Sequence, residues 1–361
     1  MNLNKKCNGC GSILTNQQDQ PGYTPKIIDN QTKMCQRCFK IKNYNYKPDH
    51  QNIDEKINNV LAQLDFTNLH IMMVLDIFDL ENTVIDELEP YQDQITFVIN
   101  KIDLLPKSFH ANLLKENIIG ILQNHGFVNP NIVFSSIKSN TSLKNLMEII
   151  NQQTKNKRKT IFFGKSNVGK SSLINGLLMV NKLPANLTTS SFINTSTNIL
   201  KIKINHNIVL DTPGVLFPDN ILNFVHNDDN KKVIYKKTVV RNYYLAPQQT
   251  IMFNKLAYIS YLDGAQTNFS FYMNADVKFK RMQTHLVQKN LDNTLLDQEL
   301  KVLYADSNFV WKTYYFVLEP ERKHNINIAG LGLISINQEA REVSVTVHEK
   351  VGVKLSSHAI I

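Results

Sequence analysis

The feature that most restricts the fold of this chain is a glycine-rich motif near its middle. Residues 164–171 read GKSNVGKS, which matches the pattern G-x-x-x-x-G-K-[ST]. The β-rich run Thr160–Phe163 precedes the motif, and a run with helical spacing, 172–178, follows it. In a strand, glycine loop and helix of this kind, backbone amides and the helix N-terminus cradle phosphate oxygens. The sequence therefore predicts an α/β protein with a parallel sheet and a nucleoside triphosphate site.

Within this loop two residues have roles that their chemistry suggests. The Lys170 ammonium is expected to reach the β- and γ-phosphates, and the Ser171 hydroxyl to ligate Mg²⁺. The other loop residues expected to line the nucleotide are Asn167, Val168, Gly169 and Ser172.

A short apolar strand pattern, 208–210, ends in Asp211-Thr212-Pro213-Gly214. Alone, this sequence is merely a good turn. Downstream of a phosphate loop it is typical of a nucleotide-sensing switch. We expect Asp211 to hold Mg²⁺ through water and the Gly214 amide to meet the γ-phosphate.

A base-reading motif lies upstream of the phosphate loop. A strand pattern, 95–99, runs into Asn100-Lys101-Ile102-Asp103. The Asp103 carboxylate can accept hydrogen bonds from the N1 and N2 donors of guanine, which adenine does not offer. Lys101 can lie along the purine face, and Asn100 can bind N7 and brace the loops. By itself the motif could be an ordinary polar turn; together with the phosphate loop it predicts guanine specificity.

A second strand pattern, 132–134, ends at Ser135 and Ser136, whose backbone amides could meet the guanine O6. These base-reading segments precede the phosphate loop, whereas ordinary GTPases of this type place them after it. A parallel sheet survives such a circular permutation if the old ends are rejoined, and the polar run Asn151–Lys159 is a suitable joint. The new break follows the switch at Asp211–Gly214, so we infer that nucleotide state is transmitted to the C-terminal part.

All four cysteines lie in two Cys-x-x-Cys pairs near the start, which are Cys7 with Cys10 and Cys35 with Cys38. Two such knuckles offer four thiolates, a closed tetrahedral shell suited to structural zinc. Reduced thiols in a loop or a redox dithiol are the alternatives. A redox dithiol fits less well, because no strand pattern leads into either pair.

Composition and charge indicate the class of protein and its division into domains. The formal net charge is +9 and the sequence pI is about 9.1, which suits a polyanionic partner. The polar start and the short apolar runs predict a soluble, cytoplasmic protein without a membrane span. We expect a zinc unit at 1–50, a permuted GTPase domain at 51–217, and a basic, mostly β domain at 218–361 that binds RNA or protein. The sequence does not determine the oligomeric state.

Local patterns give more detail for the last domain. Phe269–Tyr272 predicts a strand, while Asp276–Lys289 looks more helical and basic. Val343, Val345 and Val347 alternate with polar residues, which predicts a half-buried strand.

The chain resembles the YqeH-like circularly permuted GTPases, a family implicated in assembly of the small ribosomal subunit. The resemblance covers nearly the whole chain. The matching segments are Cys7–Cys10, Pro21–Tyr23, Cys35–Phe39, Asp76–Asp79, Asn100–Asp103, the phosphate loop, Asp211–Gly214, Ile328–Gly332 and Val345–His348. It implies GTP hydrolysis coupled to binding of ribosomal RNA, its precursor or a pre-ribosomal particle.

The resemblance also bears on two cations. Asn167 stands where potassium-activated members carry an asparagine that helps hold K⁺; a loop-bracing hydrogen bond is its simpler role. The magnesium threonine of the family maps onto Thr195 or Ser196, in a stretch that lacks the usual Pro and Gly. Val215 replaces the glutamine that orients the attacking water in Ras-like proteins. We therefore expect slow intrinsic hydrolysis of GTP to GDP, stimulated by K⁺ or by a bound particle.

Two readings of function remain open at this point. The first is a GTPase switch for small-subunit assembly. The second is a zinc-bearing, RNA-binding scaffold that binds guanine nucleotide with little hydrolysis. Another permuted ribosomal GTPase family is a weaker option, because those proteins place an RNA-binding barrel first and their zinc site last.

Overall fold

The computed structural model describes most of the chain after residue 63. The described ranges are 64–105, 109–184, 199–212, 219–225, 229–234, 238–292, 310–356 and 358–360, with residue 61 and parts of the first 39 residues. The chain forms two compact units. The first comprises Met1–Ile77, Thr83–Asp103 and Gly126–Phe217, and the second Phe78–Asn82, Leu104–His125 and Pro218–Ile361. The three-part division after residues 50 and 217 stays a prediction.

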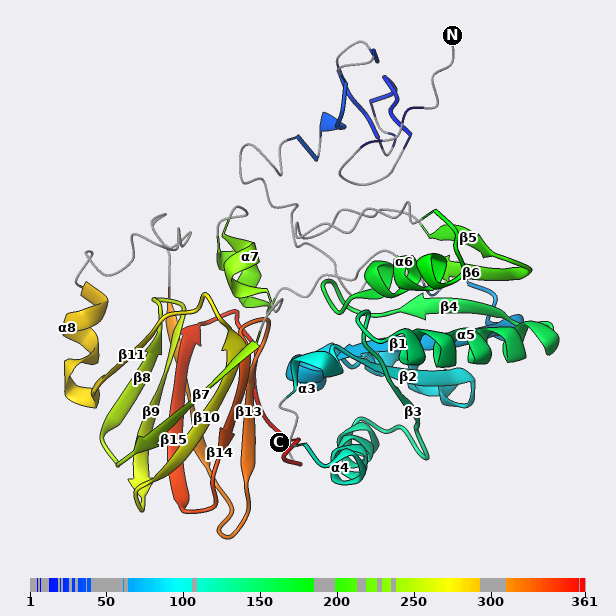
Figure 1. The fold of residues 1–361 in the computed structure, drawn as a ribbon. Coiled ribbons are helices and arrows are strands. Elements are labelled where there is room, and N and C mark those ends of the chain that lie inside the picture. Colours follow the sequence, from blue (N-terminus) through cyan, green and yellow to red (C-terminus); the bar gives the residue numbers. More distant parts are fainter. Residues whose placement is uncertain are drawn as a thin grey trace. The chain divides into compact units, whose positions relative to one another are not determined.

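The first unit contains a six-stranded sheet with the order β3-β2-β1-β4-β6-β5 (Figure 1). Its strands are β1 (Leu69–Asp76), β2 (Ile95–Asn100), β3 (Asn131–Phe134), β4 (Lys159–Phe163), β5 (Leu200–Ile204) and β6 (Asn207–Asp211). All neighbours pair in parallel except β5, which runs antiparallel to β6 at the edge. Every residue of β1 and β2 is buried, as expected of central parallel strands. The predicted α/β class is confirmed.

Two helices, α5 (Asn140–Lys155) and α6 (Lys170–Val180), pack on this sheet (Figure 1). The core between them joins Met72 of β1, Val98 of β2 and Phe162 of β4 to apolar residues of both helices. A side chain at Gly176 would place Cβ 3.1 Å from Leu143, so a small residue lets α5 and α6 approach closely. The packing fixes the helices against the strands whose ends carry the predicted site.

Further helices complete the described part of the chain before β7. They are the 3-10 helices η1 (Phe66–Asn68), η2 (Ile77–Asp79), η3 (Asp86–Gln94), η4 (Ile102–Leu104) and η5 (Ile221–Phe224), and the α-helices α3 (Leu80–Thr83), α4 (Ala111–Asn124) and α7 (Asn230–Val233).

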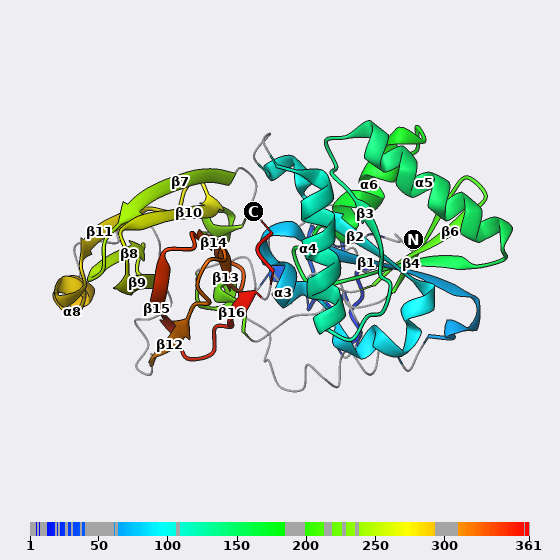
Figure 2. The same ribbon diagram turned by 90° about the horizontal axis from the view of Figure 1, so that it is seen from below.

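The second unit is dominated by two five-stranded antiparallel sheets, with the orders β16-β13-β14-β10-β7 and β11-β8-β9-β15-β12 (Figure 2). Aromatic rings join them, since Phe253 and Tyr261 of the second sheet lie 5.5 and 5.1 Å from Phe271 and Phe269 of the first. The strands are β7 (Thr238–Leu245), β8 (Gln249–Phe253), β9 (Ala257–Gly264), β10 (Thr267–Asn274), β11 (Phe279–Gln283), β12 (Trp311–Val317), β13 (His324–Ile328), β14 (Gly332–Ile336), β15 (Ala340–His348) and β16 (Val353–Ser356). The predicted β-rich C-terminal part is confirmed.

Two local expectations in this unit are wrong. The segment 276–289 is not mainly helical, because Phe279–Gln283 pairs with β8 and only η6 (Thr284–Leu286) and α8 (Val287–Asp292) are helical. The strand around Val345 is not half-buried, since its polar neighbours Ser344 and Thr346 are only 5% and 2% exposed. Side chains of both neighbouring strands flank these residues, since Ser344 stands between Ser260 of β9 and Tyr315 of β12.

The short segment Phe78–Asn82 is held within the second unit by hydrogen bonds. The Asn327 side chain donates to the Phe78 carbonyl over 2.6 Å, and the Gly330 amide donates to Asp79 over 3.0 Å. Glu81 accepts a hydrogen bond from Ser356 and pairs with His125 over 3.2 Å. Burial opposes the ionisation of Glu81, but His125, Ser356 and Lys354 outweigh it and lower the pKa of the carboxyl. This part of the chain, directly after β1, is therefore fixed firmly.

His70, near the start of β1, is buried and uncharged at neutral pH. Burial lowers its pKa from 6.5 to about 4, against a hydrogen bond to the Gln94 backbone that acts in the opposite direction. Because the unfolded chain binds the proton at a higher pH than the folded one, the free energy of unfolding falls as pH drops from 6.5 toward 4.

We expect this histidine to contribute up to ~3 kcal/mol to acid destabilisation. In thermal unfolding measured from pH 8 to pH 4, His70→Leu should give a shallower fall of Tm below pH 6.5 than the unmodified chain. The slopes of Tm against pH are compared rather than the Tm values, because the substitution also removes the hydrogen bond to Gln94 and so changes Tm at every pH. Parallel curves for the two proteins would contradict the assignment.

Candidate nucleotide site and cysteine cluster

The phosphate-loop motif has the conformation that its glycines predict. It begins directly after Phe163, the last residue of β4, and Lys170 opens α6. Gly169, which precedes the helix, has φ of 102° and lies so close to Asn100 that a Cβ would approach its Nδ2 to 2.4 Å. Backbone conformation and space both exclude a larger residue.

Three predicted site residues, Lys170, Ser171 and Asp211, lie at this loop. The Ser171 hydroxyl donates to Asp211 over 2.9 Å, and the Lys170 ammonium donates to the carbonyls of Gly164 and Lys165 over 2.7 and 3.2 Å. Burial lowers the pKa of Lys170 to about 8, opposed by the charge of Asp211. Burial likewise raises the pKa of Asp211, against Lys170 and Ser171.

The residues present fit a magnesium ion. The second carboxylate oxygen of Asp211, Oδ1, is buried without a hydrogen-bond partner and lies beside the Ser171 hydroxyl that bonds to Oδ2. A hydroxyl and a carboxylate are the oxygen ligands that Mg²⁺ prefers.

The upstream motif lies against the same loop. The Asn100 side chain donates to the Val168 carbonyl over 2.8 Å. Lys101 donates to the Asn167 carbonyl over 2.8 Å and to Asp76 over 2.5 Å. Lys101 and Asn167 both have positive φ, 66° and 67°, so both turns are tight. Segments far apart in the sequence thus come together at the carboxyl ends of β1, β2 and β4.

Asp103 occupies a polar position close to Ser136. It accepts hydrogen bonds from the Ser136 hydroxyl and from Lys138, each at 2.7 Å. Burial opposes its ionisation, but Lys138 and Ser136 outweigh that effect and lower its pKa. The carboxyl is therefore charged at neutral pH and able to accept hydrogen bonds.

The backbone amides of Ser135 and Ser136 are engaged inside the protein. Ser135 donates to the Ile99 carbonyl over 2.8 Å, and Ser136 donates to the Ser142 hydroxyl over 3.1 Å. In this arrangement a guanine O6 has to compete with those acceptors for the amides.

The remaining predicted site residues divide into two groups. Val168 is buried and Ser172 is half-buried in the first turn of α6. Thr195, Ser196, Gly214 and Val215 lie outside the described residues, so their predicted roles stay predictions.

Two residues of the site were not found by sequence reasoning. Asp76 pairs with Lys101, and Lys138 pairs with Asp103. Asp76 stands opposite Asn100 in the parallel register of β1 and β2, so its role depends on pairing that the sequence alone does not give. No local signal marks Lys138.

The cysteines near the start of the chain form a compact cluster. The sulfur atoms of Cys7, Cys35 and Cys38 lie within 4.8 Å of one another, and all three residues are buried. The Cys35 amide donates to the Cys7 sulfur over 3.2 Å, and the Cys38 amide donates to the Cys35 sulfur over 3.5 Å. Such bonds favour thiolates, and three close thiolates suit a metal such as zinc. Cys10, the predicted fourth ligand, lies outside the described residues.

Comparison with protein families matches residues 82–219 to the model described as RsgA GTPase. The chain carries an RsgA-type GTPase domain. It is thereby an enzyme of the GTPase class. This RsgA-type domain spans Asn100–Asp103, the phosphate loop and Asp211, in that order along the chain.

Individual relatives extend the similarity beyond the RsgA-type domain. Protein YqeH of Bacillus subtilis is 27% identical over 349 residues, 94% of each chain, which confirms the resemblance stated from the motifs. The small ribosomal subunit biogenesis GTPase RsgA of Malacoplasma penetrans is 29% identical over 192 residues, 52% of this chain and 60% of its own. NO-associated protein 1 of Arabidopsis thaliana is 26% identical over 258 residues, 62% of this chain and 46% of its own.

Within the described part of the chain, no helix combines the length and apolar character needed to cross a membrane.

Asp103→Asn should change the base preference of the RsgA-type domain. The amide donates where the carboxylate accepted, so we expect GTP affinity to fall about 100-fold, ~3 kcal/mol, and XTP to become the tighter ligand. Displacement of a fluorescent nucleotide by GTP and XTP measures both affinities. Glu148→Gln, an equivalent change on the exposed side of α5, is the control. Unchanged preference for GTP in the Asp103 variant would refute the assignment.

The cysteine cluster should hold one zinc ion per chain. Elemental analysis of the protein purified from zinc-containing medium measures the stoichiometry, and Cys35→Ser should lose the metal. Gln36→Ala, between the two cysteines of the same knuckle, should keep it. Because metal binding and folding are linked, chelation should also expose the first 40 residues to protease. Zinc retained by the Cys35 variant would exclude the site.

Proposed function

We propose that the chain is a GTP-binding and GTP-hydrolysing switch that assists assembly of the small ribosomal subunit. The observation that carries the proposal is the joining of the base-reading and phosphate-binding segments, in which Asn100 and Lys101 donate to carbonyls of the phosphate loop. One guanine nucleotide can then contact both segments at once.

In this proposal each residue of the site has one task. Asp103 reads guanine, Lys101 covers the purine, and Asn100 braces the loop. Lys170 holds the β- and γ-phosphates, while Ser171 and Asp211 hold magnesium together with Thr195 or Ser196. The Gly214 amide senses the γ-phosphate, and Asn167 helps to hold K⁺. Further nucleotide contacts come from Ser135, Ser136, Val168, Gly169 and Ser172.

The proposal includes a circular permutation of the GTPase domain. Its support is the strand order, since β4, which leads into the phosphate loop, pairs with β1 on one side and with β6 on the other. The joint Asn151–Lys159 consists of the end of α5, a turn and the first residue of β4. Such a joint needs no extra structure to connect the old ends.

Nucleotide state would reach the β-rich unit by two covalent routes. One follows Asp211 at the end of β6. The other follows β1, where Asp76 bonds to Lys101 and the next residues, Phe78 and Asp79, are fixed by Asn327 and Gly330 of the second unit. Any displacement of Lys101 is therefore transmitted within a few residues of chain.

The ribosomal role rests on the relatives and on charge. The name of the Malacoplasma penetrans relative assigns small-subunit biogenesis to that protein. The net charge of +9 suits ribosomal RNA as partner. The alternative is a zinc-bearing RNA-binding scaffold with little hydrolysis, which Val215 and the altered stretch around Thr195 favour.

Phosphate release separates the two functions. We expect slow release from GTP in Na⁺, at least tenfold faster release in K⁺, and a further rise with small ribosomal subunits. Lys170→Ala should bind no triphosphate tightly and release no phosphate, and Lys144→Gln on α5 is the matched control. Release at background level under every condition, with GTP still bound, would leave only the scaffold.

A further inference from the structure

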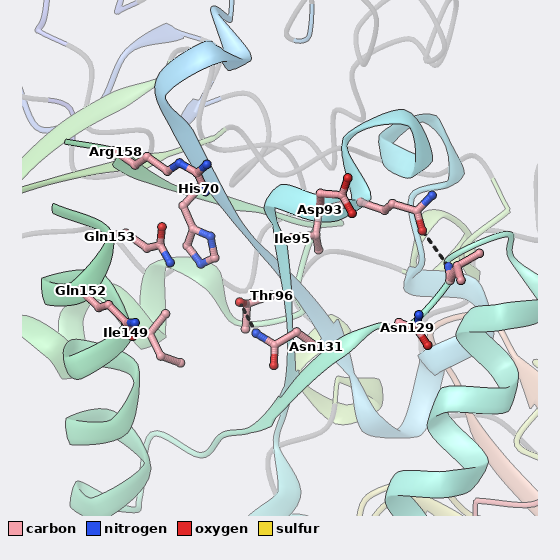
Figure 3. A pocket seen from close by; sticks show the side chains of 12 residues that line it. His70, Asp93, Ile95, Thr96, Asn129, Asn131, Ile149, Gln152, Gln153 and Arg158 are labelled. Atoms are coloured by element: carbon pink, nitrogen blue, oxygen red, sulfur yellow. Dashed lines mark hydrogen bonds between the residues drawn. The ribbon is translucent and has the colours of Figure 1, made fainter. Parts of the chain in front are cut away.

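A polar pocket of about 600 Å³ lies in the first unit, at the amino ends of the strands (Figure 3). The residues His70, Thr96 and Asn131 are the first or second residues of β1, β2 and β3, and Ile149, Gln152 and Gln153 come from the last turns of α5. The nucleotide motifs lie at the carboxyl ends of the same strands. At about 3.3 Å per residue, His70 is roughly 20 Å along β1 from Asp76.

At the pocket, polar residues stand where the apolar core of the first unit would otherwise continue. Met72, Val98 and Phe162 belong to the core under α5, and alternate residues of a strand share a face. The residues two positions earlier, His70, Thr96 and Thr160, are polar although almost fully buried. Packing alone predicts apolar residues at these places, so a run of polar ones across neighbouring strands indicates a binding role.

His70 presents a buried hydrogen-bond acceptor. Its bond to the Gln94 backbone favours the protonated ring nitrogen, so that nitrogen donates, and Nε2 has no partner. Because burial keeps the ring neutral, Nε2 carries a lone pair rather than a proton. The Gln153 Oε1 is a second buried atom without a partner, and Figure 3 shows both side chains at the same end of the pocket.

Three other polar lining side chains already have hydrogen-bond partners. Asn131 donates to Thr96 over 3.1 Å, and Gln92 accepts from the Val128 amide over 2.7 Å. Ile95 and Ile149 add apolar surface (Figure 3). A ligand of this pocket is therefore planar or compact, has apolar faces, and carries N–H donors for His70 and Gln153. The volume lies within the range of about 300–1,000 Å³ usual for small-molecule sites.

Basic residues lie on both sides of Arg158 in the chain, from the end of α5 to the start of β4. Lys155, Lys157 and Lys159 are exposed, and Arg158 lines the pocket above His70 (Figure 3). Asp93 is the acidic lining residue and can accept a further N–H. A ligand that combines N–H donors with negative charge outside the pocket fits both features.

We propose that this pocket binds one amine-bearing base, adenine, cytosine or guanine, of a single-stranded RNA whose phosphates lie on Lys155, Lys157 and Lys159. The exocyclic amino group of each of these bases supplies two N–H donors, whereas uracil has no amino group. The site is separate from the nucleotide site and does not depend on GTP hydrolysis.

Fluorescence anisotropy with eight-nucleotide oligomers of A, C and U tests the proposal. The full chain is saturated with GDP so that the nucleotide site is filled. We expect the A and C oligomers to bind about tenfold more tightly than the U oligomer. Equal affinity for all three would overturn the proposal, as would binding of short peptides to the pocket without any affinity for the oligomers.

Variants separate base recognition from charge. Gln153→Leu and His70→Leu should abolish the preference for A and C over U. The double variant Lys155→Gln, Lys159→Gln should weaken the binding of all oligomers alike, without changing that preference. The slope of log affinity against log salt concentration should become shallower by roughly 1–2. Lys144→Gln, at the other end of α5, should change nothing. A preference that persists in both pocket variants would exclude base recognition here.

GDP affinity of each variant shows whether the protein has folded. If the unmodified chain does not bind GDP, the proposed GTPase site is wrong. The pocket proposal is still tested in that case, because the preference among oligomers can be measured without nucleotide.

Discussion

The paired interaction of Lys101 with Asp76 and with the Asn167 carbonyl organises the nucleotide site. A lysine ammonium buried this far needs a charged partner, and Asp76 supplies it at the end of the neighbouring strand. The same ammonium then has donors left to hold the phosphate loop against the base-reading loop. A second contact, from Asn100 to the Val168 carbonyl, also joins the two halves of the site.

This arrangement gives the proposed switch a short covalent connection to the β-rich unit. β1 ends at Asp76, and the chain continues at once into residues fixed by backbone and side-chain hydrogen bonds in the β-rich unit. Asp79, Glu81 and Ser356 are buried, so they resist independent motion.

Much of the fold and the site was predictable because local chemistry is specific there. The glycines and Lys170 define a strand, loop and helix, and the structure has all three. The Lys101–Asp76 pair was not predictable, since it requires the register that places Asp76 opposite Asn100. The strand Phe279–Gln283 was missed because its sequence has no alternating pattern and pairing with β8 determines its conformation. The pocket around His70 was missed because its polar residues are scattered among three strands, two helices and the loops between them.

The insertion of Phe78–Asn82 and Leu104–His125 into the second unit restricts how the protein can have evolved. A β-rich module simply appended after residue 217 could be exchanged by recombination at one boundary. Here such an exchange would remove the hydrogen-bond donors of Asp79 and Glu81. Both carboxylates would then be buried without partners, which lowers the free energy of unfolding. The two units are therefore expected to be inherited together, as a single evolutionary piece.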